Sequence, residues 1–170
     1  TGEDGFEILS PTADVGGVWE AFVDRGDCTL CGLGARATLR TEMGYLLSGQ
    51  DFDPETEPRT PYEAGVGWTV DLDTDFVGRD ALAETAEAGV DESFVGVVLR
   101  ERGIARHGHA ILADGESVGH VTSGTMSPTL GEAIALGYVS SDVAEPGTEV
   151  SVVVRDQEKR AEIVATPFIE

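Results

Sequence analysis

VTSGTMSPTLGEAIALGYV, residues Val121–Val139, is the segment from which the fold of this chain can be inferred most directly. Two short apolar runs, Val118–Thr122 and Ala133–Val139, flank a loop of small hydroxylated residues, glycine, proline and one methionine. Apolar runs of this length, separated by turn-forming residues, predict two β-strands joined by a loop. The loop has a more specific composition than an ordinary turn requires.

Similar short runs lie on both sides of this unit, and turn signals such as Asp114–Gly115 and Pro146–Gly147 separate them. Regularly spaced short strands of this kind are typical of a closed β-barrel or a β-sandwich. The predicted strands are Phe94–Leu99, Ala110–Ala113, Ser117–Thr122, Ala133–Val139, Glu149–Arg155 and Arg160–Ala165. We therefore expect residues 91–170 to form an all-β domain.

Residues 1–90 mix helical and strand periodicities. Helical spacing of apolar residues and capping signals predict helices, and β-like runs predict strands. The predicted helices are Asp14–Gly26, Gly34–Met43 and Asp80–Ala88, and the predicted strands are Phe6–Ser10 and Val66–Leu72. Thr60 is a candidate N-cap, with Pro61 at the first helical position and Glu63 at the third. The expected fold class is α+β, with a boundary near Val90 between residues 1–90 and 91–170.

The charge of the chain is strongly negative. Of 170 residues, 32 are acidic and 11 are basic, which gives a net charge of −21. Such a charge repels nucleic acid phosphates and anionic membranes, so neither is an expected partner. A high-salt cytoplasm explains the composition, because counter-ions screen the self-repulsion. No apolar run approaches the ~20 residues of a membrane span, and no secretion leader is recognisable, so we expect a cytoplasmic protein.

Glu7 is the first candidate binding residue. On the predicted strand it alternates with Phe6 and Ile8, so its carboxylate points away from the face that those two residues bury. A carboxylate in that position can accept two hydrogen bonds from a planar pair of N–H groups, such as the edge of an aminopyrimidine. In an acidic chain the alternative interpretation is a solvated surface glutamate, which we prefer for Glu3 and Asp4.

Arg36 and Arg40 form the second candidate pair. They are four residues apart on the predicted helix Gly34–Met43, so they share one face and repel each other. Arg36 also lies in the first helical turn, where a cation opposes the helix dipole. An anionic ligand group or acidic side chains elsewhere in the fold would relieve both effects.

Other reactive residue types give weaker signals. Trp68 alternates with Val66 and Val70 and is either a core residue or one wall of an apolar cavity. Cys28 and Cys31 form only half of a zinc motif, and neither the remaining sequence nor the three histidines supplies the other half. Serine and threonine residues in the central loop have no candidate base nearby in the sequence, so nucleophilic catalysis is not supported.

Four separated segments, together with the central strand–loop–strand segment, carry a family resemblance in the family's own order. TGEDGFEI (Thr1–Ile8) and GLGARATLR (Gly32–Arg40) come first, GQDFDPE and EAGVGW follow, and the central strand–loop–strand segment comes last. Together they resemble the C-terminal half of the glycine-cleavage T-protein, a folate-dependent aminomethyltransferase. The resemblance runs nearly from end to end of the chain.

The resemblance implies a specific reaction and site. Members of that family transfer a methylene group from the aminomethyl-lipoyl arm of the partner H-protein to tetrahydrofolate, with release of ammonia. By resemblance, Glu7 holds the pterin, Arg36 contacts the glutamate-bearing end of the folate, and Trp68 lines the folate cavity. Arg40 is expected to be a structural ion-pair partner. No metal site is expected.

One departure from the family concerns the start of the chain. It begins at Thr1–Gly2, whereas the family's TGEDG segment lies in the middle of the protein. We therefore expect a fragment that lacks the half with the essential aspartate, contains no catalytic residue and is inactive in isolation.

Two alternatives share the fold and remain open. One is the folate module of a dimethylglycine- or sarcosine-oxidising flavoprotein. The other is a non-enzymatic folate-binding iron–sulfur assembly factor, although its Lys-Gly-Cys-Tyr-type signature is absent from the region after the arginine helix.

Overall fold

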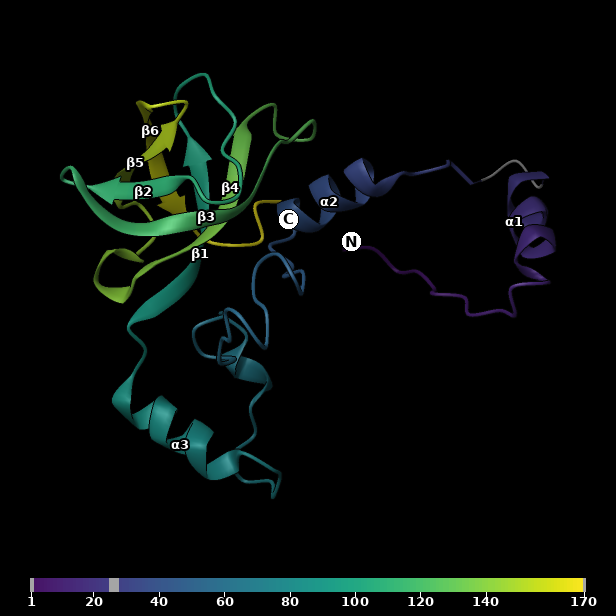
Figure 1. Cartoon of the computed structure of the whole chain (residues 1–170), viewed down its shortest axis with the longest axis horizontal. Coiled ribbons are helices and arrows are strands. Elements are labelled where there is room, and N and C mark those ends of the chain that lie inside the picture. The colour runs from purple at the N-terminus through teal and green to yellow at the C-terminus, as the bar shows by residue number, and fades with distance from the viewer. Residues whose placement is uncertain (1, 25–27, 170) are drawn as a thin grey trace.

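The second half of the chain closes into a six-stranded antiparallel β-barrel (Figure 1). The computed structural model describes residues 2–24 and 28–169. Around the barrel the strand order is β1-β4-β3-β2-β5-β6, and β6 pairs with β1 to close it. The strands are β1 (Glu92–Leu99), β2 (Ala110–Ala113), β3 (Glu116–Met126), β4 (Ala133–Ser140), β5 (Glu149–Val154) and β6 (Gln157–Val164). The six predicted strands are confirmed, and the architecture is a barrel rather than a sandwich.

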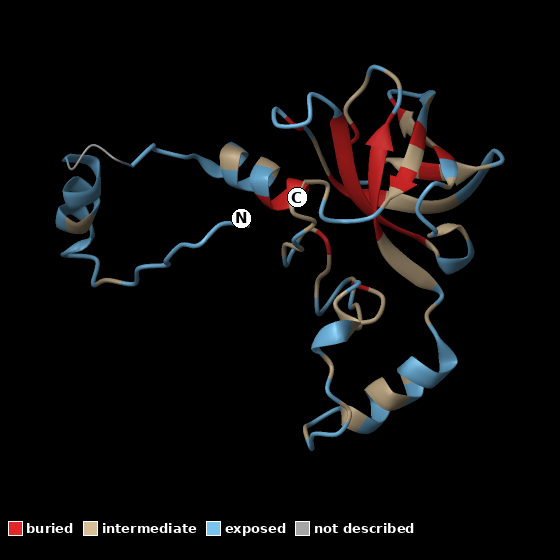
Figure 2. Cartoon of the chain, turned by 180° about the vertical axis from the view of Figure 1, so that it is seen from behind, coloured by how far each residue is buried: buried red, intermediate tan, exposed pale blue. Residues whose placement is uncertain are grey.

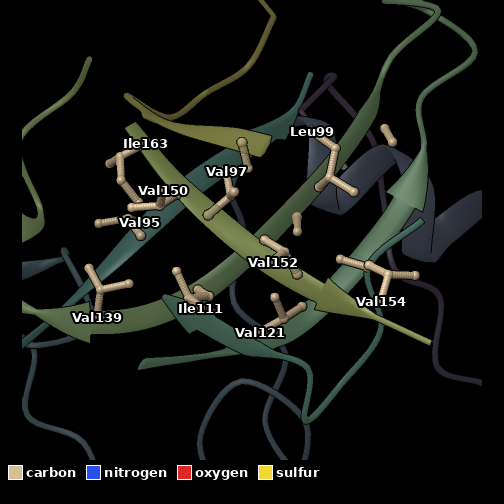
Figure 3. Packing of buried hydrophobic residues seen from close by; sticks show 14 residues of the cluster. Val95, Val97, Leu99, Ile111, Val121, Val139, Val150, Val152, Val154 and Ile163 are labelled. Atoms are coloured by element: carbon tan, nitrogen blue, oxygen red, sulfur yellow. The ribbon is translucent and has the colours of Figure 1, made fainter. Parts of the chain in front are cut away.

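One hydrophobic cluster fills the barrel (Figure 3). Alternate strand residues contribute to it, as the two-residue period of a strand requires: Val95, Val97 and Leu99 from β1, and Val150 and Val152 from β5. Most members are β-branched, and such side chains pack well on a pleated surface. Burial of each valine contributes about 1.5–3 kcal/mol, so this cluster is the main source of stability in the barrel.

Strand β4 is buried on both of its faces. Ala135 and Val139 belong to the interior cluster, whereas Ile134, Leu136 and Tyr138 lie outside it and are nevertheless fully buried. Alternation along the strand places these three on the outer surface of the barrel. Helix α2 (Leu33–Glu42) contacts this strand, and the guanidinium of Arg59 lies over the Tyr138 ring. Part of the first half of the chain is therefore packed against the barrel.

Strand β3 is longer than predicted. The prediction ended the strand at Thr122, but the ladder with β4 continues to Met126, which pairs with Ala133. A register shift between Val121 and Ser123 marks a bulge, and the extra residue allows pairing to resume beyond it. Of the small hydroxylated residues that predicted a loop, Ser123 and Thr125 therefore lie on the strand, where they bond Arg40 and Thr38 of the first half, whereas Ser127 and Thr129 remain in the loop.

The three predicted helices are confirmed with small shifts of their ends. They are α1 (Val15–Asp24), α2, which spans Leu33–Glu42, and α3 (Arg79–Ala88). Gly89 ends α3 with a φ of 81°, a left-handed conformation that glycine adopts without strain. The predicted end of the first helix at Gly26 lies outside the described residues.

Residues before α2 contribute little to the packed core (Figure 2). No residue of α1 is buried, and its apolar face remains open to solvent, with Trp19 58% exposed. Phe6 and Leu9, from the segment before α1, are almost completely exposed. The predicted strand Phe6–Ser10 is wrong, because in the described part of the chain this segment belongs to no strand or ladder.

The predicted strand Val66–Leu72 is also wrong. Its centre is a short 3₁₀ helix, η1 (Gly67–Thr69), in which the Thr69 amide donates to the Val66 carbonyl at 2.9 Å. Gly65 precedes it with a φ of 72°. The Tyr62 ring lies against Gly67, where a Cβ atom would be only 2.6 Å from it. Two glycines and the Thr69 hydroxyl, which donates to the Val66 carbonyl at 2.7 Å, therefore override the alternating apolar pattern.

The capping hydrogen bonds expected at Thr60 are present, but the helix expected to follow them is not. The Glu63 carboxylate accepts from the Thr60 amide at 2.7 Å, and the Thr60 hydroxyl accepts from the Glu63 amide at 3.3 Å. This reciprocal pair is a capping box. Only one turn forms, because the left-handed Gly65 follows directly and reverses the chain.

We expect the Glu63→Gln variant to be less stable by about 1 kcal/mol at neutral pH, and this difference to disappear in acid. Burial raises the pKa of Glu63, but hydrogen bonds from Thr60 and the charge of Arg59 outweigh it and hold the pKa below its usual value of 4.5. A depressed carboxyl pKa stabilises the fold above that usual value, and the stabilisation is lost as the pH falls through the folded-state pKa. Urea unfolding followed by circular dichroism at several pH values measures the difference in free energy of unfolding between the variant and the parent.

The matched control for that variant is Glu116→Gln. Glu116 is exposed, and no hydrogen bond or ion pair joins its side chain to another described residue. The free energy of unfolding of this control should stay within about 0.5 kcal/mol of the parent at neutral pH. A Glu63→Gln effect that is the same at pH 7 and in acid would contradict the capping role of the carboxylate.

Candidate functional site

A buried polar cluster joins α2, the following loop and β3. The Arg40 guanidinium forms an ion pair with the fully buried Asp51 and donates to the Ser123 hydroxyl at 2.6 Å. The other Asp51 carboxylate oxygen accepts from the hydroxyls of Thr122 at 2.5 Å and Ser123 at 2.6 Å. The Leu47 amide donates to Asp51 at 2.8 Å. These bonds satisfy both carboxylate oxygens of Asp51.

A second contact pins the C-terminal end of α2. The Ser127 hydroxyl donates to the buried Glu42 carboxylate at 2.6 Å, and the Phe168 amide donates to the Glu42 carbonyl at 2.8 Å. Ser123 and Ser127 therefore both donate to buried carboxylates. The prediction that Arg40 is a structural ion-pair partner is confirmed, and these serines help to hold the helix against the barrel.

A third cluster surrounds Arg59 on the outside of β4. Its guanidinium lies 4.0 Å from the centre of the Tyr138 ring and pairs with Glu57 at 2.8 Å and Glu92 at 2.5 Å. Burial lowers the pKa of Arg59, but the hydrogen bonds that its guanidinium donates to Glu92 and Glu57 outweigh burial and hold the pKa above its usual value. Burial also raises the pKa of Tyr138. This cluster was missed at the sequence level, where only Arg59 within an acidic loop could have indicated it.

The three predicted folate contacts lie at exposed positions. Glu7 is exposed in an irregular segment, Arg36 is exposed on α2, and Trp68 is 85% exposed in η1. No side-chain hydrogen bond or ion pair involving them occurs within the described residues, and the structure does not bring them together into one packed pocket. The core-residue alternative for Trp68 is therefore wrong, and all three side chains are available to a ligand.

The cysteines and histidines show no metal-binding arrangement. Cys28 and Cys31 are exposed free thiols, and the described part of the chain contains no group of three metal-ligating side chains. His107 lies 3.2 Å from the Thr122 carbonyl, and His109 accepts from the Arg106 amide at 3.3 Å. None of the helices in residues 2–24 and 28–169 is long and apolar enough to cross a membrane.

In class, the molecule is a closed antiparallel β-barrel to which a segment of helices and loops is attached through buried polar clusters, so the expected α+β character of residues 1–90 is not seen in the described residues. Comparison with known families identifies both parts. Residues 1–74 match the family model described as the GCVT N-terminal domain, and residues 93–170 match the glycine cleavage T-protein C-terminal barrel domain. The chain belongs to the glycine cleavage T-protein family.

Curated relatives agree over the whole chain. A "Probable aminomethyltransferase" of Natronomonas pharaonis is 63% identical over 170 residues, and one of Haloarcula marismortui is 58% identical over 171 residues. Each comparison covers 100% of this chain and 46% of the relative, so the chain spans about half the length of these relatives. Both organisms are halophilic archaea, which agrees with the high-salt interpretation of the charge.

A solved structure confirms the architecture. The crystal structure of glycine cleavage system aminomethyltransferase T from Bartonella henselae is similar with a TM-score of 0.81 at 31% identity. The similarity covers 91% of this chain and 44% of that one. The arrangement of helices and barrel described above is therefore the arrangement of a known member of the family.

Proposed function

We propose that this chain forms part of a tetrahydrofolate-dependent aminomethyltransferase. The reaction transfers the methylene group of an aminomethyl-lipoyl H-protein to tetrahydrofolate, releases ammonia and leaves the lipoyl arm as a dithiol. The observation that carries the proposal is the match of the whole chain, at 63% identity, to a relative named as an aminomethyltransferase. The lipoylated H-protein and folate are the proposed partners.

Within that proposal the two parts have different roles. Residues 1–90 supply folate contacts, and residues 91–170 supply the barrel that holds them. Glu7 accepts hydrogen bonds from the pterin, Arg36 pairs with the glutamate end, and Trp68 stacks against a ring. Their exposure and their lack of partners among the described residues support these roles. The arrangement contributes positioning, which raises the rate by fixing the reacting atoms in line.

The names of the relatives favour this proposal over its two rivals. The relatives and the solved structure named above carry the name aminomethyltransferase, and none is named as a demethylating flavoprotein or an iron–sulfur assembly factor. Inactivity of the chain alone follows if the catalytic aspartate lies in the 54% of the Natronomonas relative that the match leaves uncovered. A cytoplasmic location stays a prediction.

Calorimetric titration with tetrahydrofolate in molar KCl tests the proposal. The samples are this chain alone and this chain joined to the N-terminal part of the Natronomonas pharaonis relative. We expect the joined chain to bind and the Glu7→Gln variant of it to bind at least about tenfold more weakly, because the amide accepts at only one atom. Glu3→Gln is the control for charge and should stay within about twofold of the parent. Absence of binding by the joined chain would exclude the folate proposal.

A further inference from the structure

The cations of this acidic chain divide into two groups. Of the ten arginine and lysine residues within the described part of the chain, five form ion pairs with carboxylates, namely Arg40, Arg59, Arg79, Arg100 and Arg160. The other five form none with a described residue: Arg36, Arg102, Arg106, Arg155 and Lys159. With 32 acidic residues in the chain, unpaired cations are unexpected unless their position keeps carboxylates away.

Four of the five unpaired cations line one hollow. The hollow has a volume of about 830 Å³ and lies where the loop after β1, the end of β3 and the β5–β6 hairpin meet. Arg102 and Arg106 come from the loop, and Arg155 and Lys159 come from the hairpin. None of the residues that line the hollow is acidic. The hollow therefore concentrates positive charge on a molecule whose net charge is −21.

Contacts within the fold and a tight turn position three of these four cations. Arg106 donates to the Gly124 carbonyl at 2.6 Å, so its guanidinium is attached to β3. Arg155 is the first residue of the two-residue turn between β5 and β6 and has a φ of 52°, a conformation that arginine rarely adopts. Lys159 is held by Gln157, whose side-chain carbonyl accepts from its ammonium at 3.0 Å. A hydrogen bond from Arg160 is the main cause that lowers the pKa of Glu101, and the charge of Lys159 adds to it.

We propose that this hollow binds a small polyvalent oxyanion, that is, a ligand with two or more carboxylate or phosphate groups. A guanidinium presents parallel N–H donors that match either group, and three guanidiniums with one ammonium exceed what a single charge requires. Ile104, Met126 and Val154 add an apolar surface for the body of the ligand. The hollow shares no residue with Glu7, Arg36 and Trp68, so the proposal does not depend on folate binding.

The charge of the whole chain determines how such a ligand binds. At long range the net negative field repels an anion, so the affinity must come from direct contact with the four cations. Contact pairs are screened less than distant ones, but chloride competes for the same donors. We expect binding to weaken in molar KCl and to be measurable in the lowest KCl concentration that preserves the circular dichroism spectrum.

Titration calorimetry of this chain with tripolyphosphate and with citrate tests the site and separates the two ligand chemistries. The test variant is Arg102→Gln/Arg155→Gln, because neither side chain makes a hydrogen bond to another described residue and the fold does not depend on them. The control variant Arg100→Gln/Arg160→Gln removes two cations that are paired with carboxylates elsewhere on the barrel. Both variants change the net charge equally.

We expect at least one probe to bind, the test variant to bind at least about tenfold more weakly, and the control variant to stay within about twofold of the parent. The probe that binds more tightly shows whether the ligand carries phosphate groups, as tripolyphosphate does, or carboxylate groups, as citrate does. The proposal is overturned if neither probe binds, or if both variants weaken binding equally, which would indicate a general charge effect. Binding of acidic poly-glutamate alone would also overturn it, because the site would then recognise an acidic polypeptide.

Discussion

Replacing Arg40 with methionine is expected to lower the free energy of unfolding by about 3–5 kcal/mol. Asp51 is fully buried and forms its ion pair with Arg40, so the variant leaves a charged carboxylate without its cation. The Ser123 hydroxyl and the Tyr45 carbonyl lose a donor in the same step. Because the pair lies out of solvent, molar salt should change this loss little.

Urea unfolding followed by far-UV circular dichroism measures the loss. Arg160→Gln is the matched control, because Arg160 also forms an ion pair with a carboxylate, that of Glu101, but is largely exposed. An exposed pair contributes about 0–1 kcal/mol, so the control should remain near the parent. An Arg40→Met variant as stable as the control would contradict the structural role of the pair.

A double variant separates the pair from its surroundings. Adding Asp51→Asn to Arg40→Met removes the buried charge, and an amide can still accept from Thr122 and Ser123. Removing both members of a buried pair is less destabilising than removing one, because no charge remains unpaired. The double variant should therefore be more stable than Arg40→Met alone.

The barrel could be predicted from the sequence because the apolar runs and turn residues that define its strands are close together in the sequence. Ala110–Ala113 was predicted with the bounds that the structure gives it, and the other strands differ by a few residues at their ends. Each strand has an apolar run, and turn residues separate several of them. The exception is β3, where the bulge after Val121 allows a strand to continue through residues that usually form loops.

The first half was harder to predict because its contacts are distant in the sequence. Arg40 and Ser123 are 83 residues apart, and Arg59 meets Tyr138 across a similar separation. No local pattern encodes such a pairing, although helix spacing did single out Arg40. The strand prediction for Val66–Leu72 was wrong for a different reason. Glycines next to an alternating run permit a turn that the apolar pattern alone does not reveal.

The candidate site was predicted by resemblance rather than by chemistry. Glu7, Arg36 and Trp68 are exposed and separate, so the chain alone gives no geometric reason to group them. The charged hollow shows the opposite case. The two arginines of the loop lie 49 to 57 positions from the two cations of the hairpin, as in the pairs Arg106–Arg155 and Arg102–Lys159, and only the closure of the barrel brings loop and hairpin together.

Replacing Gly119 with alanine is expected to destabilise the barrel by at least about 3 kcal/mol. A Cβ atom at this position would lie 2.0 Å from the Tyr138 carbonyl oxygen and 2.7 Å from the Val139 Cα atom. Both are backbone atoms of β4, so no change of side-chain rotamer can relieve the overlap. The strands β3 and β4 would have to separate, and with them the ladder that holds Tyr138 beneath Arg59.

The matched control for Gly119→Ala is Gly103→Ala. A Cβ atom at Gly103 would lie 3.6 Å from its nearest neighbour, an ordinary contact with the flexible Lys159 side chain. Its free energy of unfolding should change by less than about 1 kcal/mol. Urea unfolding of both variants compares a backbone overlap with a tolerated methyl group in the same barrel. A Gly119→Ala protein whose free energy of unfolding lies within about 1 kcal/mol of its parent would mean that β3 and β4 do not approach as closely as the fold requires. The close pairing of these strands also positions the bulge that presents Ser123 to Asp51, so that contact would then lack its structural basis.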